Sequence, residues 1–162
     1  MLSDYCDNNF TDKNTTHSYI DLYQSLFESK KESATHILEV GIGPGVHHQY
    51  GGSIMMWADY FTTAQIYAVD IIPIDHVRKE LIEHPRIHLC TSNDAYNMNF
   101  FVNKFLNKGL KFDMLLDDGP HTLESMRNFV TMYSQVLKED GILVIEDVQD
   151  INWLDTLRAV TP

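Results

Sequence analysis

Acidic side chains follow the apolar runs of this chain at the points where we expect strands to end. Asp70 closes the second run, Asp117 and Asp118 close the fourth, and Glu146 and Asp147 close the fifth. Parallel strands end at one edge of a sheet, so these carboxylates would share a rim, and no Lys or Arg lies near them in sequence to offset the charge. A divalent cation would relieve the repulsion, and hard oxygen ligands suit Mg²⁺ or Mn²⁺ better than Zn²⁺. The candidate ligands are Asp117, Asp118, Glu146 and Asp147. For Asp118 and Asp147, capping of the following helix is the simpler alternative.

His121 follows the turn Asp117-Asp118-Gly119-Pro120 and stands at the expected start of a helix. The positive end of a helix favours the neutral imidazole, which accepts a proton, so His121 is the candidate general base. The alternative is a histidine that only forms a hydrogen bond at the helix start. His47 and His48 lie in a loop rich in Gly and His, and we expect them to contact substrate or cofactor.

A glycine turn after the first strand-like run predicts a pocket for a nucleotide-type cofactor. The run 36–40 leads into Gly41, Gly43 and Gly45, and the next run ends at Asp70. Glycine lets the backbone turn sharply and approach a ligand, and a carboxylate at the end of the second strand is placed to take ribose hydroxyls. The spacing lacks the third glycine of the dinucleotide pattern GxGxxG, which favours S-adenosylmethionine over NAD.

Apolar runs alternate with amphipathic stretches along most of the chain. This alternation predicts an α/β fold, a doubly wound parallel sheet with helices on both faces, in a single domain over 1–162. An amphipathic helix at about 16–29 precedes the first strand and is expected to pack on the sheet or to cover the pocket. Strands are predicted at 36–41, 65–70, 86–90, 112–117 and 141–146, and helices at 53–61, 75–83, 96–108, 121–138 and 152–158.

The chain stops soon after the fifth predicted strand, and a doubly wound domain usually adds further strands there. The fifth strand would then form a sheet edge with apolar residues on both faces, which is prone to aggregation unless it is covered. We expect either that the chain is a fragment or that a second subunit of a homo-oligomer covers this edge.

Composition narrows the class of protein. The chain has 162 residues, of which 44% are hydrophobic and 22% are charged, and its formal net charge is −11. That charge repels a polyphosphate backbone, so nucleic acid is not an expected partner. The two cysteines, Cys6 and Cys90, are far apart and fit free thiols in a reducing compartment. No apolar run is long enough for a membrane span, and we expect a soluble, cytoplasmic protein.

Several short motifs together give the chain a resemblance to class I S-adenosylmethionine-dependent methyltransferases. Within that class it resembles the metal-dependent sugar O-methyltransferases of the macrocin and mycinamicin type, which include cephalosporin hydroxylase-like proteins. The resemblance covers about 10–150 and implies a Rossmann-like fold. It rests on Thr11-Asp12-Lys13, His17-Ser18-Tyr19, Ile37-Leu38-Glu39-Val40-Gly41, Gly52-Ser53, Asp117-Asp118-Gly119-Pro120-His121 and Val144-Ile145-Glu146-Asp147.

The resemblance implies roles for individual residues. Mg²⁺ would be bound by Asp118, Glu146 and Asp147, and His121 would take the proton. Ser53 would reach the carboxylate of the methionine moiety, and Ser92, Asn93 and Asp94 would lie near the adenine. The cofactor-binding residues would be Glu39, Gly41, Gly43, Ser53, Asp70, Ser92, Asn93, Asp94 and Asp117.

The expected function is transfer of a methyl group to a hydroxyl of a sugar or other small molecule, assisted by Mg²⁺. A catechol-like acceptor is an alternative, because adjacent hydroxyls chelate a metal in both classes. The main rival is a catalytically silent cofactor-binding or assembly domain, and a second rival is a nucleotide-dependent oxidoreductase.

Overall fold

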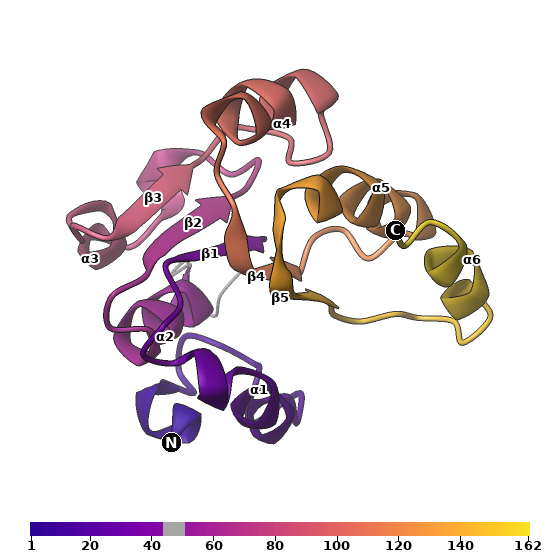
Figure 1. Cartoon of the computed structure of the whole chain (residues 1–162). Coiled ribbons are helices and arrows are strands. Elements are labelled where there is room, and N and C mark those ends of the chain that lie inside the picture. Colours follow the sequence, from indigo (N-terminus) through magenta and orange to yellow (C-terminus); the bar gives the residue numbers. More distant parts are fainter. Residues whose placement is uncertain (44–50) are drawn as a thin grey trace.

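The computed structural model describes residues 1–43 and 51–162 (Figure 1). Gly45, His47 and His48, which the sequence places in the cofactor loop, lie outside the described residues. Within those residues, no helix is long and apolar enough to cross a membrane.

Five strands form one parallel sheet in the order β3-β2-β1-β4-β5, which confirms the predicted Rossmann-like fold. The register places Val40 beside both Val69 and Asp117, and Asp117 beside Ile145, so these strands end at the same level. The polar residues that follow them therefore meet at one edge. The strands are β1 (His36–Val40), β2 (Gln65–Val69), β3 (Ile87–Cys90), β4 (Phe112–Asp117) and β5 (Leu137–Ile145).

Helices cover both faces of the sheet (Figure 1). On one face, α1 (Ile20–Phe27) and α2 (Gly52–Tyr60) enclose a core with Ile37 and Met114. On the other, α4 (Met98–Lys104) and α5 (Leu123–Tyr133) enclose a core with Leu38 and Leu115. Successive residues of a strand point to opposite faces, so Ile37 and Leu38 enter different cores. The short helix α3 (Lys79–Ile82) precedes β3, and α6 (Trp153–Ala159) packs against α5.

Four predicted helices differ from those observed. The helix predicted at about 16–29 is α1, Ile20–Phe27, followed by a 3-10 turn, Glu28–Lys30, and residues 16–19 lie before it. The helix predicted at 75–83 is a 3-10 turn, Ile74–His76, followed by the single turn of α3, because Val77 and Arg78 between them are extended. The helix predicted at 96–108 is α4 followed by a 3-10 turn, Leu106–Lys108.

The helix predicted at 121–138 begins two residues later and ends at Tyr133. Thr122 caps it by accepting a hydrogen bond from the Ser125 backbone N–H at 3.1 Å, which places His121 outside the helix. A 3-10 turn, Ser134–Val136, then leads into β5, which starts at Leu137 instead of the predicted 141. The extra strand residues are accommodated by a register shift between the pairs of Phe112 and Met114.

Candidate functional site

Two adjoining cavities open at the carboxyl edge of the sheet. Both are lined by Gly41, Gly43, Asp118 and Gly119. The first, of about 390 Å³, extends past Asp70 and has mainly apolar walls. The second, of about 270 Å³, extends under the N-terminal segment 8–16. The apolar walls of the first include Val40, Val69, Ile71, Ala95 and Pro120, and the N-terminal residues of the second are Asn8, Phe10, Thr11, Asp12, Lys13, Thr15 and Thr16.

The cavities meet at Gly41, where β1 turns against the end of β4. Gly41 has a φ of +100°, and a Cβ there would lie 2.1 Å from the carbonyl oxygen of Asp118. The Asp118 N–H donates to the Val40 carbonyl at 2.9 Å. Only glycine allows this backbone conformation and this close approach without strain.

Asp70 lies at the end of β2, as predicted, and its carboxylate is held by backbone N–H groups. Oδ2 accepts from Ile42 at 2.6 Å and from Gly43 at 3.3 Å, and Oδ1 accepts from Ile72 at 3.1 Å. The glycine turn therefore fixes the orientation of the carboxylate. A carboxylate offers about four lone-pair sites, so Oδ1 retains acceptor capacity beyond its bond to Ile72.

Of the segment 92–94 that follows β3, Asn93 and Asp94 line the first cavity. The Asn93 N–H donates to the Asp70 carbonyl at 3.0 Å, which ties the ends of the two strands together. Ser92 has a φ of +55°, an uncommon conformation for a residue with a side chain. Asp117 is buried and accepts a hydrogen bond from the Tyr96 hydroxyl at 2.5 Å. Burial raises the pKa of Asp117 to about 6.

Glu39 lies in β1, the strand that leads into the glycine turn, and its side chain is fully buried. It accepts hydrogen bonds from the Ser53 hydroxyl at 2.7 Å and from the Trp57 indole at 2.5 Å, both on α2. Burial raises the pKa of Glu39 to about 6. In this structure Glu39 and Ser53 are therefore partners of each other, and their assignment to the cofactor stays a prediction.

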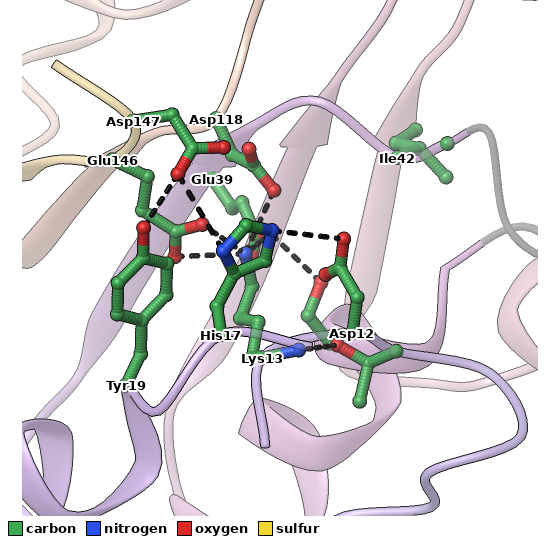
Figure 2. Close-up of polar contacts among 12 residues, drawn as sticks. Asp12, Lys13, His17, Tyr19, Glu39, Ile42, Asp118, Glu146 and Asp147 are labelled. Carbon is green, nitrogen blue, oxygen red and sulfur yellow. Dashed lines mark hydrogen bonds and ion pairs between the residues drawn. The ribbon is translucent and has the colours of Figure 1, made fainter. Parts of the chain in front are cut away.

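Lys13 lies at the centre of the acidic cluster, although the sequence analysis gave it no role. Its side chain is 1% exposed, and its ammonium lies 2.7 Å from Asp118 Oδ2 and 2.8 and 2.7 Å from the two oxygens of Glu146 (Figure 2). Glu39 Oε1 lies 3.6 Å away. Burial lowers the pKa of this ammonium, but the three carboxylates raise it by more, so Lys13 stays charged. The cation that offsets the acidic rim is thus supplied from a segment more than 100 residues away in sequence.

Glu146 faces the interior of this cluster. Its side chain is 4% exposed, and it accepts a hydrogen bond from the Tyr23 hydroxyl as well as those from Lys13. Burial raises the pKa of Glu146, although Lys13 acts in the opposite direction. Its assignment as a metal ligand stays a prediction.

Asp118, His121 and Asp147 form the outer half of the cluster. Each offers one ligand atom, and these atoms all lie within 4.8 Å of one another. His121 Nε2 is 3.7 Å from Asp118 Oδ1 and 3.8 Å from Asp147 Oδ2. His121 and Asp147 have φ values of +53° and +52°, a strained conformation that is concentrated at functional sites. All three side chains are about a quarter exposed, so a ligand can reach them.

Tyr19 and His17 approach the same group from the N-terminal segment. The Tyr19 hydroxyl donates to Asp147 Oδ1 at 2.5 Å, and His17 Nδ1 lies 3.9 Å from that oxygen (Figure 2). The motifs Thr11-Asp12-Lys13 and His17-Ser18-Tyr19 contribute to the resemblance noted in the sequence. That resemblance was the one signal for these residues, because no local pattern indicates that Lys13 is buried.

The arrangement combines an apolar cavity with an oriented carboxylate, a cluster of two carboxylates and an imidazole, and a second cavity with hydroxyl and amide groups. Such a site can hold a nucleoside-type ligand, a hard divalent cation and a polar small molecule next to one another.

Residues 38–148 match the family model described as a methyltransferase domain. Mycinamicin VI 2''-O-methyltransferase of Micromonospora griseorubida is 28% identical over 155 residues, which are 94% of this chain and 37% of that protein. Demethylmacrocin O-methyltransferase of Streptomyces fradiae is 28% identical over 139 residues, or 85% and 33% of the two chains. The chain thus spans about a third of the length of these relatives.

The chain is also similar to solved structures of a methyltransferase. A methyltransferase of the mycinamycin biosynthetic pathway, in complex with Mg, SAH and mycinamycin VI, superposes with a TM-score of 0.77 and 27% identity, covering 95% of this chain and 39% of that one. A crystal form of the same enzyme with Mg and SAH gives a TM-score of 0.76 and 28% identity, covering 90% of this chain and 39% of that one.

Proposed function

Because the chain belongs to the methyltransferase-domain family, we propose that it binds S-adenosylmethionine and transfers the methyl group to a hydroxyl of a sugar, with the help of Mg²⁺. The observation that carries this proposal is the convergence of Asp118, His121 and Asp147 beside the wall that the two cavities share. The relatives named above are O-methyltransferases, which supports the same reaction class.

The first cavity suits the adenosine part of the cofactor. Its volume of about 390 Å³ falls in the range of roughly 300 to 1,000 Å³ usual for small-molecule sites. Asp70 would accept a hydrogen bond from a ribose hydroxyl through Oδ1, and Asn93 and Asp94 would lie beside the base. The glycine turn at Gly41 and Gly43 would let the backbone approach the cofactor closely.

The carboxylates of Asp118 and Asp147 suit a divalent cation. They are hard oxygen donors, they end adjacent strands, and they leave space for water and substrate oxygens, as Mg²⁺ or Mn²⁺ prefers. Glu146 would lie behind them as the third predicted ligand and would have to share its oxygens with Lys13.

His121 would act as the general base. Its Nε2 faces the same space as the two carboxylates, and its partly exposed imidazole can accept the proton of an acceptor hydroxyl placed there. When bound, the cofactor supplies an electrophilic methyl group, and the metal ion makes the acceptor hydroxyl more acidic. The carboxylates of Asp118 and Asp147 would stabilise the imidazolium that forms.

The second cavity would take the acceptor. Its N-terminal wall presents amide, hydroxyl and carboxylate groups from Asn8, Thr11, Asp12, Thr15 and Thr16. These groups match the hydroxyls of a sugar better than the flat apolar face of a catechol.

The experiment that tests this function is titration calorimetry with S-adenosylhomocysteine, with NAD as the comparison ligand. We expect micromolar binding of S-adenosylhomocysteine, none of NAD, and a roughly 5- to 150-fold loss of affinity in Asp70→Asn, which weakens a charge-assisted hydrogen bond. Asp75→Asn, the same change at an exposed aspartate, serves as the control. Binding of NAD, or equal affinity in the Asp70 variant, would contradict the proposal.

Turnover separates an enzyme from a silent binding domain. A glycosylated macrolide with free sugar hydroxyls, incubated with labelled S-adenosylmethionine and Mg²⁺, should acquire label, and chelation of the metal should stop the reaction. Cofactor binding without any transfer would favour the silent domain.

A further inference from the structure

In Asp118 and in Asp147, the two carboxylate oxygens face different partners. Asp118 gives Oδ2 to the Lys13 ammonium at 2.7 Å, and its Oδ1 faces His121 Nε2 at 3.7 Å. Asp147 gives Oδ1 to the Tyr19 hydroxyl at 2.5 Å, and its Oδ2 faces His121 Nε2 at 3.8 Å. In both residues, one oxygen contacts the N-terminal segment, as Figure 2 shows for Lys13 and Tyr19, and the other faces His121.

The segment that carries Lys13 and Tyr19 is itself fixed. The Tyr19 N–H donates to the Lys13 carbonyl at 3.0 Å, so the two residues are held relative to each other by a turn. The Tyr19 ring stacks on His17 at 5.2 Å between centroids and also contacts Tyr23 of α1. Lys13 is buried, which leaves its ammonium little freedom to move.

Phe10, which precedes Lys13 in the chain, packs against the start of α2 and against Arg78. A Cβ on Gly52 would lie 2.0 Å from the Phe10 carbonyl oxygen, and the Arg78 guanidinium lies 4.0 Å from the centre of the Phe10 ring. The segment from Phe10 to Tyr19 therefore spans from the start of α2 to the ends of β4 and β5.

We propose that Lys13 and Tyr19 are positioning residues of the metal site, which select one oxygen of Asp118 and one oxygen of Asp147 for the divalent ion. The inference rests on the proposed function, because it needs a metal at this site. A carboxylate fixed through one oxygen presents the other in a defined direction, and losing such a second-layer hydrogen bond weakens metal affinity by about 10- to 100-fold.

The geometry also couples the N-terminal segment to the metal. If docking of Lys13 and Tyr19 favours metal binding, metal binding must favour docking by the same factor, because the coupling is reciprocal. The wall of the acceptor cavity, which the segment supplies, would then be ordered by the ion.

Titration with Mn²⁺, followed by electron paramagnetic resonance of the free ion, tests the selection of oxygens. Tyr19→Phe removes the hydroxyl from Asp147 and keeps the ring, and we expect roughly 10-fold weaker Mn²⁺ binding. Tyr67→Phe, the same change at a strand residue whose ring packs against His88, Phe105 and Phe112, is the matched control and should bind Mn²⁺ like the wild type. Tyr23→Phe removes the hydroxyl from Glu146 and reports whether that residue also takes part.

A second measurement tests whether the segment that carries Lys13 and Tyr19 is coupled to the metal, and it uses the wild type together with Tyr19→Phe. Hydrogen exchange at the backbone N–H groups of 16–19 should slow when Mn²⁺ is added to the wild type, and this protection should be smaller in Tyr19→Phe. A merely structural role for Tyr19 would speed exchange equally with and without metal.

The outcomes distinguish the inference from the proposed function. If Asp147→Asn abolishes Mn²⁺ binding while Tyr19→Phe binds Mn²⁺ as the wild type does, the metal site stands and the positioning role is refuted. If the wild type binds no Mn²⁺, both the positioning role and the metal part of the proposed function are refuted. A 10-fold loss in Tyr19→Phe together with metal-dependent protection of 16–19 supports the inference.

Discussion

Replacing Lys13 by methionine should destabilise the protein strongly, because it removes the only described cation in contact with Asp118 and Glu146 at the buried cluster. Lys13 is 1% exposed and makes three contacts of 2.7 to 2.8 Å with these carboxylates. Methionine has a similar length and is apolar, so the loss is one of charge and hydrogen bonds. Removing one partner of a buried ion pair costs about 3 to 5 kcal/mol, since the remaining charge stays buried without its counter-ion.

Urea unfolding followed by circular dichroism measures this loss, and thermal unfolding should show a fall in melting temperature of roughly 6 to 20 °C. Lys79→Met is the matched control, because Lys79 is 80% exposed and pairs with Glu83 at 3.3 Å. Its free energy of unfolding should change by less than about 1 kcal/mol.

Two further results sharpen the test. Adding Glu146→Gln to Lys13→Met should recover part of the loss, because the double change removes both charges. The penalty of Lys13→Met should also shrink as the pH falls, because burial raises the pKa of Glu146 and loss of the ammonium, which lowers it, raises that pKa further, so that the carboxylate takes up a proton. A Lys13→Met variant within about 0.5 kcal/mol of the wild type would refute the reasoning, since it would mean that the ammonium is not buried against these carboxylates.

The pKa of Asp113 is lowered because hydrogen bonds from Lys138 and from two backbone N–H groups outweigh its burial. A lowered pKa gives stability that is present above the unfolded value of about 3.9 and is lost as the pH falls through the folded pKa. Asp113→Asn should therefore be less stable than the wild type at pH 7 and approach it in acid. A stability difference in urea unfolding that does not change with pH would contradict this. Gly41→Ala should destabilise the fold by about 1 to 3 kcal/mol through its positive φ and its contact with Asp118, and a stability equal to that of the wild type would show that the turn relaxes freely. His121→Ala should reduce methyl transfer by about 10²- to 10⁴-fold while Mn²⁺ affinity stays within about threefold, and a 10-fold weaker affinity would make the imidazole a ligand instead of the base.

The strands were predictable because their signal is local. The runs that form β1 and β4 are apolar, and parallel strands covered on both faces require such runs. Once the strands were known, the rule that parallel strands end at one edge brought Asp70, Asp118 and Asp147 together without further information. The ends of α5 and β5 were misplaced because the amphipathic pattern continues beyond Tyr133, and the pairing of Leu137 with Phe112 is a tertiary contact.

The sequence by itself determined the fold class and the set of acidic and imidazole groups at the rim, because residue type and period are properties of the chain. The tertiary structure decided how those groups are used. It placed Lys13 against Glu146, turned Glu39 toward Ser53, and divided the oxygens of Asp118 and Asp147 between inner and outer partners. These contacts join residues more than 100 positions apart or depend on burial, and neither distance in space nor burial of a single lysine is encoded in the local pattern of the sequence.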